Sequence, residues 1–274
     1  MARFISSGHL PLRRNSDISV IFRGMLLIAL AVAPGVAVCL FIFSLNRLGK
    51  ASMRYLVTAF LLGAAATLPA LAVQLLADDV RIEPWRHSIL SYLWFAFGAV
   101  AFSEEGSKFL VLRFYAYPKK VFREPFDGVI YGVMIGMGFA TVENIEYVRQ
   151  FGLETGVSRF FLAIPAHASF AVLMGYPVGR AKFAHRGRAA LLLKGLGMAV
   201  LFHGSFDFFL FLQQSREATK YLSTGVLSFG AFATFYIAVR LAMRALRLHQ
   251  HLQDEGSETD DNQQINFNQR ENDG

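Results

Sequence analysis

The sequence predicts an all-α membrane protein, a polytopic helix bundle with about seven transmembrane helices. Hydrophobic residues make up 54% of the 274-residue chain, charged residues only 17%, and the mean hydropathy is +0.39. Apolar windows of about 20 residues, each nearly free of charge, recur along the chain, and a helix needs this length to cross a hydrocarbon core roughly 30 Å thick. These observations exclude a soluble protein.

Three regions follow one another along the chain. We expect a polar N-terminal arm (1–23), a transmembrane domain (24–243) and an acidic C-terminal tail (250–274) that is disordered because it has little to bury. Within the domain, apolar runs place the expected helices at roughly 24–45, 55–77, 89–114, 127–148, 159–179, 189–212 and 221–243. Pro34 and Gly35 should bend the first helix. Acidic and histidine residues enter only the third to sixth runs, so we expect the chemistry within 89–212.

The net charge of +7 comes from bases that lie between the apolar runs. They do not form a basic face with interleaved aromatic residues, so we expect the lipid bilayer, and not nucleic acid, as a partner. The loops carry 14 Lys and Arg residues on one side and 6 on the other, which places the N-terminus outside and the C-terminal tail in the cytoplasm. Cys39 is the single cysteine, so no disulfide can form within the chain.

The third helix holds two adjacent acids and a base. An ionisable residue inside a membrane costs at least about 2.5 kcal/mol, so each one needs a partner or a purpose. Glu104 and Lys108 are four residues apart and can pair along one face of the helix. Glu105 lies about 100° further round and must face a neighbouring helix or a cavity. Two adjacent carboxyl groups can supply a general base, and a structural or ion-pathway role is the alternative.

The fourth helix carries a stripe of small residues and then an acid. Gly128, Gly132 and Gly136 repeat every four residues, a pattern that allows close packing against another membrane helix. Glu143 and Asn144 follow near the helix end. Taken alone, Glu143 could equally reach the membrane interface.

Two histidines and an aspartate complete the polar residues. His203 and Asp207 are four residues apart on the sixth helix, so the carboxylate can orient the imidazole or complete a ligand pair. A local hydrogen bond is the alternative. His167 follows the kink expected at Pro165 in the fifth helix. On straight helices Glu104 would lie roughly 22 Å from the outer face of the membrane and the two histidines about 12–15 Å from it. Glu104 and the histidines therefore lie at one depth only if the third helix tilts or begins deeper.

These residues fall into four ordered motifs that resemble the PrsW family of intramembrane proteases, over roughly residues 24–212. The motifs are Glu104-Glu105-Gly-Ser-Lys108, Phe139-x-x-x-Glu143-Asn144, His167-Ala-Ser-Phe and His203-Gly-Ser-Phe-Asp207. The resemblance extends to a glutamic-type superfamily that includes the CAAX prenyl endopeptidases and also inactive scaffolds. Lys108 and Glu143 depart from the CAAX pattern, which favours the PrsW branch.

The resemblance implies a multi-pass protease of the bacterial inner (cytoplasmic) membrane that cleaves a membrane-anchored, anti-sigma-factor-like protein during regulated intramembrane proteolysis. It implies catalytic positions at Glu104, Glu105, Glu143, His167 and His203. It leaves the oligomeric state open. A non-catalytic scaffold or a proton-coupled transporter is the non-enzymatic alternative, although inverted repeats are not evident in the sequence.

For the reaction we expect the Glu104/Glu105 pair to bind and deprotonate a water molecule, with Lys108 and Glu143 positioning the pair. The histidines would donate hydrogen bonds to the oxyanion. This version needs no cofactor.

In the alternative version, His167, His203 and Glu105 bind Zn²⁺ and leave one coordination position open for water. Asp207 orients His203 in the first version, and Lys108, Asn144 and Asp207 are supporting residues in both.

Overall fold

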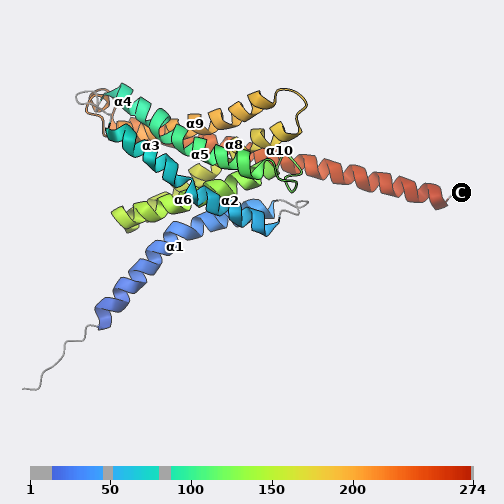
Figure 1. The fold of residues 1–274 in the computed structure, drawn as a ribbon, viewed down its shortest axis with the longest axis horizontal. Helices are drawn as coiled ribbons and strands as arrows, with labels where there is room; N and C mark the ends of the chain where they lie inside the picture. Colours follow the sequence, from blue (N-terminus) through green and yellow to red (C-terminus); the bar gives the residue numbers. More distant parts are fainter. Residues whose placement is uncertain (1–13, 46–51, 80–87, 273–274) are drawn as a thin grey trace, which may run out of the picture.

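The computed structural model describes residues 14–45, 52–79 and 88–272, and the described residues contain helices and no strand. Figure 1 shows a bundle of helices from which α1 and α10 project in different directions. The α-helices are α1 (Arg14–Ser44), α2 (Met53–Ala65), α3 (Thr67–Asp79), α4 (Ile89–Trp94), α5 (Phe102–Val111), α6 (Asp127–Phe151), α7 (Leu153–Phe161), α8 (Ala163–Phe183), α9 (Arg188–Leu212) and α10 (Thr224–Asn272). Two π-helical segments, η2 (Phe95–Ala101) and η3 (Leu112–Ala116), and a 3₁₀ turn, η4 (Ala218–Lys220), complete the elements.

Six stretches are helical, long and apolar enough to cross a membrane: Gly24–Ser44, Met53–Ala77, Asp127–Phe151, Leu153–Phe183, Arg188–Leu212 and Thr224–Leu248. Residues 89–116 run through the bundle beside them as α4, η2, α5 and η3. With this segment the crossings reach the seven that the sequence predicts, and the prediction of an all-α polytopic bundle is confirmed.

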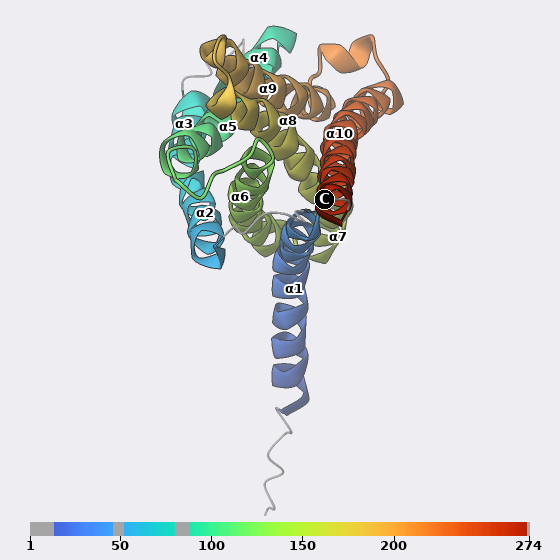
Figure 2. The ribbon, with the colours of Figure 1, turned by 90° about the vertical axis from the view of Figure 1, so that its right-hand side faces the viewer.

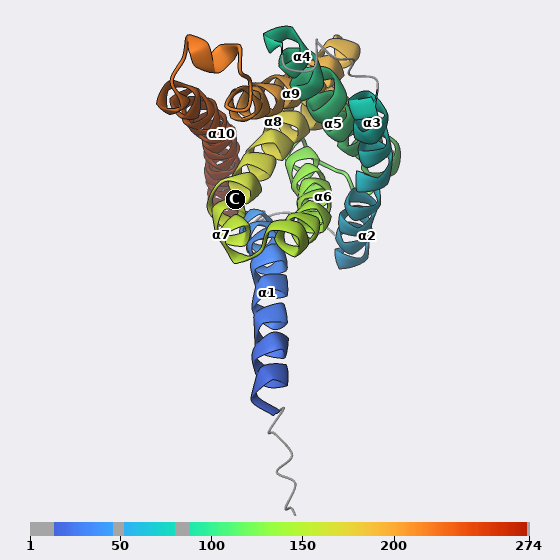
Figure 3. The same cartoon turned by 90° about the vertical axis from the view of Figure 1, so that its left-hand side faces the viewer.

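Helix α6 lies at the centre of the bundle. Figures 2 and 3 show it surrounded by α1, α2, α5 and α8. Of its apolar window, 78% is buried in the protein, whereas the other crossings bury 28% to 50% of theirs. The outer helices present apolar side chains outward, as expected where lipid is the solvent. Most of α6 is therefore enclosed by protein, whereas its last turns carry exposed polar residues such as Glu146 and Arg149.

The glycine stripe of α6 lies against α8. A Cβ atom on Gly128 would collide with the backbone of Gly175 and Gly179, and one on Gly132 would lie 3.0 Å from the carbonyl oxygen of Ala171. Gly136 would meet the Cβ of Ala171 at 3.0 Å. The absence of side chains on this stripe lets two backbones approach closely, which brings the C-terminal part of α6 next to the N-terminal part of α8.

Several expected helices are divided. The second run is split at Ala66 into α2 and α3, and Pro69 lies in the first turn of α3, where its missing N–H has no helical acceptor to lose. The start of the fifth run belongs to the short helix α7, which begins after Gly152 (φ +82°) and ends at Phe161, before Leu162. The third run changes between α and π geometry, and this irregularity has no simple sequence signature.

The two ends of the chain differ from the predicted regions. Helix α1 begins at Arg14, inside the expected polar arm, and residues 1–13 lie outside the described residues. Helix α1 continues through Pro34, and Figure 1 shows its direction changing along its length. Helix α10 continues to Asn272, through the tail that we expected to be disordered. This stretch contains no proline and one glycine, so no residue stops the helix at the membrane boundary.

Candidate active site

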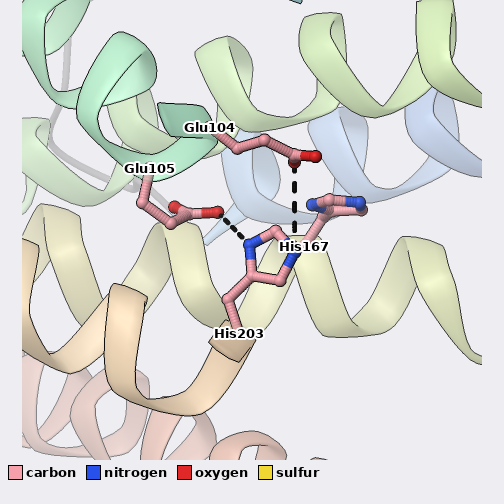
Figure 4. A group of neighbouring side chains, drawn as sticks. All are labelled: Glu104, Glu105, His167 and His203. Atoms are coloured by element: carbon pink, nitrogen blue, oxygen red, sulfur yellow. Dashed lines mark hydrogen bonds and ion pairs between the residues drawn. The ribbon is translucent and has the colours of Figure 1, made fainter. Parts of the chain in front are cut away.

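Four side chains converge from three helices inside the bundle. Glu104 and Glu105 come from α5, His167 from α8 and His203 from α9, and one nitrogen or oxygen from each lies within 4.8 Å of the others. All four residues are buried, with 1% to 6% of their surface exposed. Figure 4 shows the two carboxyl groups and the two imidazoles pointing toward one another. The layer is level, contrary to the depths expected for straight helices.

Glu105 is the more tightly held of the two acids. Its Oε1 accepts a hydrogen bond from the Lys108 ammonium at 2.8 Å and lies 2.8 Å from Nδ1 of His203. Its residue is only 1% exposed. The bond to Lys108 stays within α5, whereas the bond to His203 ties α5 to α9.

Glu104 has one occupied and one looser oxygen. Oε1 accepts a hydrogen bond from the side-chain amide of Gln74 on α3 at 3.1 Å. Oε2 lies 3.4 Å from the Lys108 ammonium and 3.9 Å from Nε2 of His203. Glu104 Oε2 therefore has only long contacts, and both contacts given above for Glu105 fall on its Oε1, so each acid has an oxygen that is less tightly held.

His203 faces a carboxylate on each side. Nδ1 is close to Glu105, as above, and Nε2 lies 3.2 Å from Oδ2 of Asp207, one turn along α9. Phe170 stacks on the ring at a centroid distance of 5.1 Å and an interplanar angle of 16°. The ring plane is therefore fixed by hydrogen bonds at its edges and by an aromatic contact on its face.

The partners of His167 define its tautomer. Nδ1 lies 3.3 Å from the Lys108 ammonium, which can only donate, and Nε2 lies 2.9 Å from Oε2 of Glu143, which accepts. A neutral imidazole with its proton on Nε2 satisfies both contacts. The lone pair on Nδ1 then points into the cluster.

Glu143 contacts His167 and a base that the sequence analysis assigned to a loop. Arg159 on α7 lies 3.0 Å from Oε2 of Glu143, and its Nε donates to Oδ1 of Asn144 at 2.6 Å. We expected Glu143 to position the acid pair, but its contacts are to His167 and Arg159, because the close α6–α8 packing turns this face of α6 toward α8. Lys108 does contact both acids.

Sequence reasoning missed Gln74 and Arg159. Gln74 is the only amide in its apolar run, a signal that was available. Arg159 marked the start of the expected fifth helix, so its charge was assigned to the loop.

The buried network carries an excess of negative charge. Within the described part of the chain, the charged groups that contact one another here are the carboxylates of Glu104, Glu105, Glu143 and Asp207 and the cations of Lys108 and Arg159. With the carboxyl groups ionised and the imidazoles neutral, the formal charge is −2. Because uncompensated charge is costly in a low-dielectric interior, either two protons or one divalent cation must balance it.

The donor set fits a divalent ion such as zinc. Zinc binds imidazole nitrogens and carboxylate oxygens at about 2.0–2.2 Å in tetrahedral geometry, which places two ligand atoms about 3.4 Å apart. The candidate atoms lie within 4.8 Å of one another, so the side chains would close around the ion by about 1 Å. The Nδ1 lone pair of His167 faces the Lys108 ammonium at 3.3 Å, so the ammonium would have to move away for Nδ1 to bind the ion.

Comparison with known proteins identifies the family of the chain. Residues 51–243 match the family model described as "PrsW family intramembrane metalloprotease". The chain is 34% identical to Protease PrsW of Shouchella clausii over 67% of its length and 83% of that protein. It is 34% identical to Protease PrsW of Halalkalibacterium halodurans (68% and 84% covered) and 30% identical to that of Bacillus subtilis (67% and 82%). No solved structure matches the chain. The chain belongs to the PrsW family and is a multi-pass intramembrane protease.

Proposed function

We propose that this protease hydrolyses a peptide bond in a membrane-anchored, single-span protein of the anti-sigma-factor type, at the cluster of Glu104, Glu105, His167 and His203. The observation that carries the proposal is the convergence of two carboxyl groups and two imidazoles at one buried point, within 4.8 Å of one another. An intramembrane protease needs a base and hydrogen-bond donors at the place where water attacks, and the described residues bring groups of both kinds together here.

Glu104 is the general base in this proposal. Its looser Oε2 takes a proton from water as the water oxygen attacks the peptide carbonyl carbon, and the same carboxyl group then gives the proton to the leaving amine as the C–N bond breaks. Gln74 holds the other oxygen and so fixes the direction of the carboxylate. Lys108, 3.4 Å and 2.8 Å from the two acids, reduces the electrostatic cost of placing two carboxylates side by side.

His167, His203 and Glu105 would hold a divalent metal ion, with Glu104 left free as the base. An ion bound there would polarise the peptide carbonyl and activate the water. The donor set, the formal charge of −2 and the description of the matching family support this version. Glu143 and Asp207 act in it as partners that orient His167 and His203.

A metal-independent version has its own support. Both nitrogens of His203 lie close to carboxylate oxygens, at 2.8 Å and 3.2 Å, as an imidazolium with two N–H donors would require. In that version the histidines donate to the oxyanion. Purified protein stripped of metal, with removal verified by elemental analysis, separates the two: inactivity that added Zn²⁺ reverses supports the metal version, and full activity contradicts it.

For the membrane orientation we propose an external N-terminus and a cytoplasmic C-terminus in the inner membrane of a bacterium, as the loop charges indicate. Reporter fusions after 45–52 and after 184–187 should report a cytoplasmic location. A fusion at 213–223 should report the external side. The reverse pattern would contradict the orientation and leave the site unaffected.

The test in cells compares three variants with a matched control. Glu104→Gln, Glu105→Gln and His203→Ala are expressed with a single-span reporter substrate, and each should abolish cleavage. Glu146→Gln is the control, because Glu146 lies on α6 three residues after Glu143 and its side chain is 49% exposed. This variant should cleave the reporter normally. Normal cleavage by all three site variants, at equal expression, would refute the proposal. The inactive Glu104→Gln protein should also trap native substrates for identification by mass spectrometry.

A further inference from the structure

Arg159 is the one member of the buried network that comes from the short helix α7. Its guanidinium makes an ion pair with Oε2 of Glu143 at 3.0 Å and a hydrogen bond to Oδ1 of Asn144 at 2.6 Å. It also lies over the ring of Tyr147, 4.0 Å from the centroid. The side chain is 14% exposed. Three contacts of different kinds thus fix one guanidinium against α6.

Another arginine close in sequence shows the contrast. Arg149 pairs with Glu146 on the same helix at 2.7 Å, and its side chain is 69% exposed. Such an exposed pair contributes little to stability or to the placement of other groups. Arg149 therefore provides a matched control, since it has the same charge and a comparable bond without contact to the site.

The ion pair of Arg159 continues into the site through a shared oxygen. Oε2 of Glu143 contacts both Arg159 on one side and Nε2 of His167 on the other, at 3.0 Å and 2.9 Å. The chain of contacts therefore runs from α7 to α6 to α8. Without Arg159, Glu143 would keep its contact with His167 alone. The side chain of Glu143 is 21% exposed, so its carboxylate could then turn away from His167.

The position of α7 is built into the local sequence. Gly152 takes a positive φ of 82°, which reverses the chain after α6, and α7 then packs back against it. A Cβ on Gly156 would lie 3.1 Å from Val148 on α6 and 3.7 Å from Leu30 on α1. The chain reversal at Gly152 and the close approach at Gly156 place Arg159 within reach of Glu143.

We propose that Arg159 is a positioning residue for proteolysis: it holds Glu143 in the place where Glu143 keeps the proton of His167 on Nε2 and directs Nδ1 into the cluster. The proposal rests on the proposed function only in assigning His167 to the reaction. An arginine suits this position because Nε of its planar group donates to Asn144 while another nitrogen of the same group makes the ion pair with Glu143, and the single ammonium of a lysine cannot make both contacts in the same geometry.

The proposal predicts a graded series of variants. Arg159→Leu should lower kcat about 10- to 100-fold, the range typical of partners that orient a catalytic or metal-binding histidine, and leave KM within about twofold. Arg159→Lys keeps the charge but not both bonds, and should lie between this variant and the wild type. In Arg159→Ala, added guanidinium should restore part of the lost kcat. Arg149→Leu should match the wild type throughout.

The experiment has two independent readouts on purified full-length protein in detergent. The first is the ¹⁵N spectrum of protein labelled at histidine, with His167 assigned from a His167→Gln sample. We expect the His167 signals to move in Arg159→Leu and to stay in place in Arg149→Leu. The second is the rate of cleavage of the single-span reporter by the same samples. Melting temperatures identify variants that do not fold. If Arg159→Leu does not fold, the His167 signal and the cleavage rate of Arg159→Lys test the proposal.

An unchanged His167 signal in folded Arg159→Leu would overturn the proposal. A fall in kcat would also overturn it if added guanidinium did not restore activity to Arg159→Ala and if Arg159→Lys lost as much activity as Arg159→Leu. A wild-type protein that fails to cleave any reporter would count against the proposed function, whereas the His167 signal would still decide the role of Arg159.

Discussion

Removing the ammonium of Lys108 tests the charge balance of the site. Its Nζ lies 2.8 Å from Glu105, 3.4 Å from Glu104 and 3.3 Å from Nδ1 of His167, and the side chain is 5% exposed. In Lys108→Met the formal charge of the network changes from −2 to −3, with two carboxylates left side by side. Breaking a buried ion pair by removing one partner costs about 3–5 kcal/mol. At about 2–4 °C per kcal/mol, the melting temperature should fall by roughly 6–20 °C.

A second substitution should reverse most of this loss. Lys108→Met combined with Glu104→Gln returns the formal charge to −2, so the double variant should melt well above Lys108→Met alone. Lys194→Met is the matched control, because Lys194 lies on the membrane helix α9 but is exposed, and its melting temperature should stay near that of the wild type. The assay is thermal unfolding in detergent followed by intrinsic fluorescence. A fall of less than about 2 °C in Lys108→Met, or no recovery in the double variant, would refute the electrostatic reasoning.

Two further predictions concern packing and pH. Gly128→Ala should destabilise the protein by about 1–3 kcal/mol, because the new Cβ meets the backbone of α8, 2.6 Å from the Cα of Gly179, whereas Gly197→Ala, with open space around it, should be neutral or stabilising in the same melting assay. Burial and the nearby Asp127 raise the pKa of Glu124 in the loop before α6, so the folded state favours its protonated form. The contribution of this carboxyl group is thus fully present at acidic pH and is lost as the pH rises through the raised pKa. The melting temperature of Glu124→Gln relative to that of the wild type should accordingly increase as the pH rises from 5 to 8. A decrease in this difference over the same range would contradict the prediction.

Much of the fold and of the site could be predicted from the sequence because the membrane makes buried charge conspicuous. Glu104, Glu105, His167 and His203 were found as ionisable residues inside apolar runs, and the structure brings all four together. The contact of Lys108 with Glu104 followed from helical spacing, whereas its shorter contact with Glu105 did not. These inferences need only the cost of charge in lipid and the 3.6-residue period of a helix.

The remainder depends on geometry that one-dimensional patterns do not carry. Straight-helix arithmetic placed Glu104 too deep, since it assumed one straight α-helix from residue 89, whereas this stretch begins as α4 and continues as the π-helical η2, which accounts for part of the difference. Arg159 was counted with the loop bases because its partner Glu143 is on another helix, and only the chain reversal at Gly152 brings them together. The extension of α10 to Asn272 was missed because polar composition was read as disorder.

The most direct test of the account is the rate at which purified Glu104→Gln cleaves a single-span reporter in detergent, compared with Glu146→Gln prepared in the same way. Both variants replace a glutamate with its neutral isostere, but Glu104 lies in the cluster and Glu146 is exposed. The account predicts a fall of about 10²- to 10⁴-fold for Glu104→Gln, the usual loss when a general base is removed, and a change of less than about twofold for Glu146→Gln. A folded Glu104→Gln protein that cleaves the reporter within about twofold of the wild-type rate would contradict it.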